Sequence, residues 1–202
     1  MDFQTFRLKT KDYPLFKFVD LLKWFPNDNE QTVKQNLKFW TRKKWLKRII
    51  RGVYKLAETK IEDEFLIASY LNENSYVSLE SALSFHGMIT EIPYEITSVT
   101  IKKTKKYKTE YGIFSYRKIK IDLFFGFKLI SGDNYLYRMA TPEKALFDFI
   151  YLNQKEIRTP NYFREMRLTF PKNFSWKELS SLAVYLKNKI IISYLKSYVD
   201  NQ

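Results

Sequence analysis

The segment from Gln31 to Ala57 contains nine basic residues and neither Asp nor Glu. Its first half has the spacing of an amphipathic helix, with Val33, Leu37 and Trp40 on one face. In its second half, β-forming residues flank Arg51–Gly52, which favours a two-stranded hairpin with a tight turn. The pattern therefore predicts a helix and a following hairpin that are both basic.

The basic helix is expected to run to about Lys44, after a short helix at Phe16 to Phe25 that Pro26 ends. Two capping pairs, each an Asn or Asp followed three residues later by Glu or Gln, could open it: Asn27 with Glu30, or Asp28 with Gln31. The order of helix, basic helix and basic hairpin is typical of a winged helix-turn-helix. In that fold the second helix enters the DNA major groove and the hairpin tip contacts flanking phosphate or the minor groove.

This interpretation predicts a DNA-binding surface in which cations contact phosphate, while Thr32, Gln35 and Asn36 read base edges. A solvated helix beside an ordinary hairpin is the alternative, and the absence of acids from the window favours DNA binding. The predicted DNA-binding residues are Thr32, Lys34, Gln35, Asn36, Lys38, Arg42, Lys43, Arg48 and Arg51.

Beyond the hairpin, helices are expected at Ile61 to Asn72 and from the N-cap Ser78 to Gly87. The apolar period then changes from about 3.6 to 2, which predicts the strands of a twisted antiparallel sheet. The expected strands are Ile96 to Thr104, Lys106 to Thr109, Ile113 to Ile121, Leu123 to Ile130 and Tyr135 to Ala140, with turns at Tyr111–Gly112 and Ser131 to Asn134.

The remainder of the sequence is predicted to be helical. Thr141 as N-cap and Pro142 at the first position begin a helix that ends near Leu152. Ser175 and Glu178 form a capping box for another helix, and a last helix lies near the C-terminus.

A second basic segment, Lys102 to Lys120, contains eight basic residues and one acid, Glu110. It could contact DNA or RNA, face an acidic protein, or form the polar side of a hairpin whose other side is core. A functional surface is favoured, because the lysines between 102 and 108 repel one another unless a polyanion is present. The predicted second basic surface comprises Lys102, Lys103, Lys105, Lys106, Lys108, Arg117 and Lys118.

The sequence offers little for catalysis. It has no Cys and a single His, His86, so thiol chemistry is excluded and a transition-metal site is not expected. His86 is interpreted as a structural imidazole near a helix end, and no GxxxxGK[ST] phosphate loop is present. We therefore predict no enzymatic activity, no cofactor and no metal.

The net charge is +13, and residues 1–58 contribute +8 of it. An excess of this size favours polyanionic partners. The opening MDFQTFRLK lacks the basic and apolar regions of a signal peptide, and no apolar run approaches the length of a membrane span. A cytoplasmic location is expected.

Several segments, taken in order, resemble the AbiEi-family antitoxins of type IV toxin–antitoxin systems over about residues 14–155. They are RIIRGVYKL, YVSLESALSFHGMI (Tyr76 to Ile89), ITSVTIKKTKKYKTEYGIFSYRKI (Ile96 to Ile119), FFGF (Phe124 to Phe127) and ATPEKALFDFIYL (Ala140 to Leu152). The resemblance implies an N-terminal winged-helix domain joined to a larger α/β domain with antitoxin activity. It also implies repression of the protein's own operon through inverted repeats, and neutralisation of a nucleotidyltransferase-like toxin without a stable complex.

The family resemblance further implies that basic residues of the C-terminal domain contact DNA, which draws attention to Lys102 to Lys108. We expect an α+β protein with a winged helix-turn-helix at residues 1–58 and, at 59–202, an α/β domain whose mainly antiparallel sheet is flanked by helices. The expected function is that of a sequence-specific DNA-binding autoregulator and antitoxin. The alternative is an RNA- or protein-binding antitoxin that acts through the second basic surface.

Overall fold

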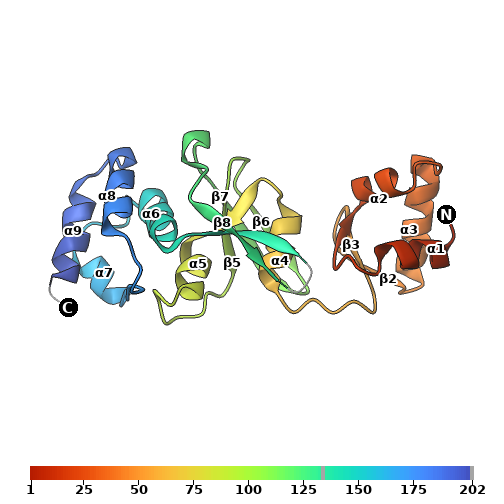
Figure 1. Cartoon of the computed structure of the whole chain (residues 1–202), viewed down its shortest axis with the longest axis horizontal. Helices are drawn as coiled ribbons and strands as arrows, with labels where there is room; N and C mark the ends of the chain where they lie inside the picture. Colours follow the sequence, from red (N-terminus) through yellow and green to blue (C-terminus); the bar gives the residue numbers. More distant parts are fainter. Residues whose placement is uncertain (133–134, 201–202) are drawn as a thin grey trace. The chain divides into compact units, whose positions relative to one another are not determined.

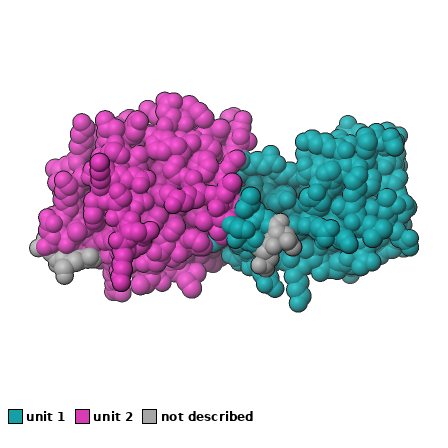
Figure 2. All heavy atoms as spheres, in the orientation of Figure 1, with its two compact units in different colours: residues 1–73, 109–111, 131–136 teal, residues 74–108, 112–130, 137–202 magenta. Residues whose placement is uncertain are grey.

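The computed structural model describes residues 1–132 and 135–200, which form a mixed α+β protein with two β-sheets (Figure 1). The chain divides into two compact units, coloured separately in Figure 2. Unit 1 comprises Met1–Glu73, Thr109–Tyr111 and Ser131–Leu136, and unit 2 comprises Asn74–Lys108, Gly112–Ile130 and Tyr137–Gln202.

Unit 1 begins with three helices and a small antiparallel sheet with the strand order β1-β3-β2. These elements are α1 (Phe3–Thr10), β1 (Phe16–Lys17), α2 (Phe18–Trp24), α3 (Glu30–Arg42), β2 (Leu46–Ile50) and β3 (Val53–Leu56). Helix α4 (Glu64–Leu71) follows.

One hydrophobic core joins these first elements. The predicted stripe of Val33, Leu37 and Trp40 is buried in it, at most 4% exposed. Helix α1 contributes the buried ring of Phe6, whose centroid lies 4.6 Å from that of Trp40 and 5.4 Å from that of Phe16. Since burying a large apolar side chain contributes about 1.5–3 kcal/mol, this shared core fixes α3 on the sheet.

The local predictions for this region are partly confirmed. The hairpin has its turn at Arg51–Gly52, where Gly52 adopts a φ of +89° that favours glycine. The predicted helix at Phe16 to Phe25 begins two residues late, because Phe16 and Lys17 pair with β3 as strand β1. Neither predicted cap of the basic helix is used: Asn29 accepts the backbone N–H of Thr32 at 2.7 Å.

Unit 2 is built on a six-stranded sheet with the order β6-β7-β5-β4-β9-β8, together with helices and two 3₁₀ turns. The strands are β4 (Ser75–Val77), β5 (Ile96–Thr100), β6 (Lys105–Thr109), β7 (Gly112–Lys118), β8 (Phe127–Ser131) and β9 (Leu136–Ala140). The helices are α5 (Leu79–Phe85), α6 (Pro142–Leu152), α7 (Asn161–Glu165), α8 (Trp176–Leu182) and α9 (Ile190–Val199), and the 3₁₀ turns are η1 (Ile121–Leu123) and η2 (Ala183–Tyr185).

The sheet is mainly antiparallel, as predicted, but two of its central pairings are parallel. Strand β4 pairs antiparallel with β5, but β4 pairs parallel with β9 and β5 parallel with β7. The short connections from β6 to β7 and from β8 to β9 make those neighbours antiparallel. Strand β6 exposes three lysines whereas β7 buries Phe114 and Tyr116, so β7 takes the inner place beside β5.

The predicted strand bounds also shift. The strand expected at Leu123 to Ile130 starts only at Phe127, after η1, and those expected at Ile96 to Thr104 and Ile113 to Ile121 end at Thr100 and Lys118. Of the turn predicted at Ser131 to Asn134, residues 133–134 lie outside the described residues.

Helices α5 and α6 lie beside each other on one face of the sheet, as Figure 1 also shows. Helix α6 begins as predicted, with Thr141 accepting the Lys144 N–H at 3.2 Å and Pro142 at the first position. Ser78 stands before α5, but it makes no cap bond and donates its hydroxyl to Asp148 instead. Half of the predicted Ser175–Glu178 capping box forms, because the Ser175 hydroxyl accepts the Glu178 backbone N–H at 3.2 Å. The other half does not, because the Ser175 backbone N–H donates to the Glu143 carboxylate at 2.7 Å.

A buried polar cluster connects α6 to the sheet. Lys144 and Asp148, both 0% exposed, form an ion pair one helical turn apart. The Tyr76 hydroxyl accepts from Lys144 and donates to Asp148, with both distances 2.8 Å, and Ser78 donates to the same carboxylate at 2.8 Å. Lys144, Tyr76 and Ser78 all donate to Asp148, which suits an ionised carboxylate.

Burial raises the pKa of Asp148 and lowers that of Lys144, because an apolar surrounding disfavours each charged form. The hydrogen bonds that the carboxylate accepts lower the pKa of Asp148 and so oppose the effect of burial. The Lys144 ammonium also lies 5.2–5.5 Å from the ring centroids of Tyr76, Phe125 and Phe147. Aromatic faces therefore replace part of the water that the ammonium loses.

Gly126 allows the chain to pass close to Lys144, and Gly126→Ala should destabilise the protein by about 2–4 kcal/mol. Its φ is +75°, and an added Cβ would lie 2.9 Å from two Lys144 side-chain carbons. Gly87→Ala is the matched control, because Gly87 has a φ of +67° with no atom within 4 Å of the added Cβ. Urea denaturation should show a clearly larger loss for Gly126→Ala, and equal losses would contradict the packing argument.

Candidate nucleic-acid interface

An open groove of about 1000 Å³ lies between α3 and the β2–β3 hairpin. Five of its eleven lining residues are basic and one is acidic. The lining consists of Phe18, Glu30, Lys34, Leu37, Lys38, Thr41, Arg42, Arg48, Arg51, Gly52 and Tyr54. Five of the nine predicted DNA-binding residues therefore line this groove.

The buried face of α3 determines which side chains reach this groove. Because successive residues of a helix are about 100° apart, Lys34, Lys38 and Arg42 fall within a sector of roughly 80°. That sector lies away from the buried stripe, and all three side chains are exposed. Arg48 on β2 and Arg51 at the hairpin turn supply the opposite wall.

Most of the groove's positive charge is uncompensated. Lys34 pairs with Glu30 one turn earlier and lies 5.5 Å from the Phe18 ring centroid. The other four cations form no ion pair within residues 1–132 and 135–200; they are Lys38, Arg42, Arg48 and Arg51. Cations gathered in this way repel one another, and an anionic ligand would relieve the repulsion.

The prediction of three base-reading residues needs correction. Gln35 is exposed next to the basic sector, but Thr32, Asn36 and Lys43 lie about 160–200° around the helix from Lys34. Asn36 is half-buried and donates its amide to the Met1 carbonyl oxygen at 3.1 Å. Lys43 lies over the Phe39 ring, outside the groove.

The predicted DNA-binding set leaves out Phe18, Thr41 and Tyr54, which line the groove. It also leaves out Gln31, which lies on the same outward face of α3 as Gln35. Gln31 is exposed one turn before Gln35, so the four-residue spacing was the signal that could have identified it. Phe18 and Tyr54 could not be found in this way, because their place in the groove depends on pairing between β1 and β3.

The predicted second basic surface is smaller than expected. Arg117 does not belong to it, because its guanidinium donates to the Asn153 side chain and the Leu152 carbonyl, both at 2.7 Å, at the C-terminal end of α6. Lys106 forms an ion pair with Glu95. The exposed remainder, around the edge strand β6, consists of Lys102, Lys103, Lys105, Lys108 and Lys118.

His86 ends α5 and is half-buried, with its Nε2 2.7 Å from the Ala140 carbonyl oxygen. Because a carbonyl only accepts, this contact places a hydrogen on Nε2 and holds the ring in a structural role. Among residues 1–132 and 135–200, no group of three potential ligands could hold a metal ion. Within the same residues, no helix has both the length and the apolar character needed to cross a membrane.

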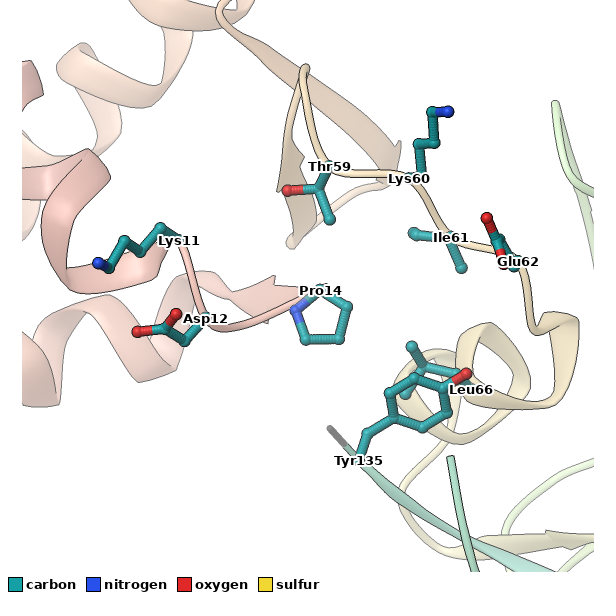
Figure 3. A pocket seen from close by; sticks show the side chains of 9 residues that line it. All are labelled: Lys11, Asp12, Pro14, Thr59, Lys60, Ile61, Glu62, Leu66 and Tyr135. Atoms are coloured by element: carbon teal, nitrogen blue, oxygen red, sulfur yellow. The ribbon is translucent and has the colours of Figure 1, made fainter. Parts of the chain in front are cut away.

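A further pocket of about 310 Å³ is shown in Figure 3. It lies between the segment after α1, the extended chain before α4, and Leu66 with Tyr135. Two lysines and two carboxylates line it, so neither sign of charge dominates. None of its nine lining residues is a His or a Ser.

The groove between α3 and the hairpin therefore gathers five cations, four of which form no ion pair in the described part of the chain. Comparison of the chain with protein-family models gives no match, and comparison with curated proteins gives none either.

Proposed function

We propose that the protein binds double-stranded DNA through the groove between α3 and the β2–β3 hairpin, with residues 1–58 acting as a winged helix-turn-helix. The order helix, strand, helix, helix, strand, strand supports this assignment, as does the β1-β3-β2 sheet. Helix α3 would be the recognition helix and the hairpin the wing.

The proposal is carried by the four cations of the groove that form no ion pair within the described residues. They come from two elements, so together they can contact phosphates on both sides of an inserted helix. The 13 residues of α3 span about 20 Å, and a major groove about 12 Å wide admits a helix. Arg48 and Arg51 would then reach flanking phosphate or the adjacent minor groove.

The regulatory part of the proposal rests on the resemblance to AbiEi-family antitoxins. The protein would act as a sequence-specific autoregulator at an inverted-repeat operator beside its own promoter. It would also counter a nucleotidyltransferase-like toxin without forming a stable complex with it. No catalytic step is assigned to the protein itself.

Binding of the full chain to a duplex of its own upstream region should exceed binding to an unrelated duplex of equal length. The preference should persist from roughly 50 to 200 mM salt, because base contacts depend on salt less than phosphate contacts do. Fluorescence anisotropy at several salt concentrations measures both the affinity for each duplex and the slope of log affinity against log salt concentration. Equal, salt-labile binding to the two duplexes would contradict sequence-specific recognition.

A second candidate function is binding of RNA or an acidic protein through the lysines around β6. It is favoured by their exposure on an edge strand and by the cation–aromatic contact of Lys105, 4.5 Å from the Tyr107 ring centroid. DNA binding by a variant without the groove cations, compared with a variant without the lysines around β6, distinguishes the two candidates.

A further inference from the structure

The outward ridge of α3 divides into a neutral half and a basic half. Opposite the buried stripe, positions 31, 35, 38 and 42 follow one another within a sector of about 60°. The first two are Gln31 and Gln35, and the last two are Lys38 and Arg42. All four side chains are exposed. A helix lying in a DNA groove would present the two amides in its N-terminal half, which is the part of a recognition helix that contacts bases.

Neither amide is used by the protein itself. The side chains of Gln31 and Gln35 make no hydrogen bond to any other group in the part of the chain that the structure describes. Asn36 offers the contrast, because its amide is tied to the Met1 carbonyl oxygen. The two glutamines therefore retain both a donor and an acceptor for a ligand.

From this placement we infer that each DNA half-site contains two adenines, one facing Gln31 and one facing Gln35. The inference rests on the proposed function, in which α3 enters the DNA major groove. A carboxamide places a donor beside an acceptor. In the major groove, adenine presents its N7 acceptor next to its N6 donor, whereas guanine presents two acceptors. The carboxamide thus pairs with adenine through two hydrogen bonds, and the cations suit phosphate or guanine.

The separation of the two glutamines sets the distance between the adenines. Four residues of helix rise about 6 Å, and successive base pairs rise about 3.4 Å. The two adenines should therefore lie within about two base-pair steps of each other.

Selection of a randomised duplex library with the full-length protein tests this inference. The wild-type protein should enrich adenine at two nearby positions. Gln31→Ala should remove the enrichment at one position and Gln35→Ala at the other, with a loss of about 5- to 150-fold in affinity for the selected site. Gln4→Ala is the control, because Gln4 is also an exposed helical glutamine but belongs to α1 and not to α3.

Replacing the selected adenines by 7-deazaadenine removes the N7 acceptor and leaves base pairing intact. The wild-type protein should lose affinity for this duplex, and each Gln→Ala variant should be insensitive at its own position. Enrichment without adenine, or adenine enrichment that survives both substitutions, would overturn the inference and leave DNA binding standing. Failure of the wild-type protein to bind any duplex would overturn the proposed function itself.

Discussion

Replacing Lys144 with Met is expected to lower the free energy of unfolding by about 3–5 kcal/mol, which is a large part of the total for an ordinary domain. The substitution leaves Asp148 wholly buried without its ammonium partner. The hydroxyl groups of Tyr76 and Ser78 would still donate to the carboxylate, but they carry no compensating charge. Urea denaturation followed by circular dichroism measures the loss.

The double variant Lys144→Met, Asp148→Leu distinguishes the cost of an unpaired buried charge from the cost of changed side-chain packing. A buried pair replaced by apolar groups of similar volume is often neutral in stability. Here the buried hydroxyls of Tyr76 and Ser78 would also lose their partners, so the double variant should recover only part of the loss. Lys177→Met, at an exposed position of α8, should change stability by less than about 0.5 kcal/mol. A Lys144→Met protein as stable as the wild type, or a double variant no better than the single one, would show that the pair does not constrain the fold.

The burial of the Lys144–Asp148 pair could not be predicted from the local sequence. Lys and Asp four residues apart usually form an exposed pair on a helix surface. Here every residue from Glu143 to Ile150 is buried, because α6 packs against α5, α8 and the sheet. A helix that is covered on several sides cannot be recognised from a window of its own sequence, since its partners are supplied by distant segments.

The elements that were predicted correctly depend on local chemistry. The Thr141–Pro142 start of α6, the Arg51–Gly52 turn and the buried stripe of α3 each follow from residues within one or two turns of chain. The errors at Asn36 and Arg117 have the opposite origin, because their partners lie 35 or 36 residues away. Sequence placed the basic helix and hairpin side by side, but it did not show which polar side chains would be used internally.

The triple variant Lys38→Ala, Arg48→Ala, Arg51→Ala should weaken DNA binding roughly 100-fold near physiological salt, and to about the same extent on every sequence. All three side chains are exposed, and none forms an ion pair in the described part of the chain, so the fold should be unaffected. If each contacts one phosphate, the slope of log affinity against log salt should fall by about 2.7. Anisotropy titrations at several salt concentrations give both quantities, and circular dichroism checks the fold.

The matched control is Lys102→Ala, Lys103→Ala, Lys105→Ala, which removes the same three charges from the exposed lysines around β6 and so also takes the net charge from +13 to +10. If the groove is the DNA site, this variant should keep the affinity and the salt slope of the wild type to within a few fold. Equal losses in both triple variants would mean that net charge, rather than the groove, governs binding. A loss of DNA affinity in the control variant alone would show that DNA binds at the surface around β6 instead. In that case the helix and hairpin of unit 1 would have no direct role in recognition, in spite of their unpaired cations.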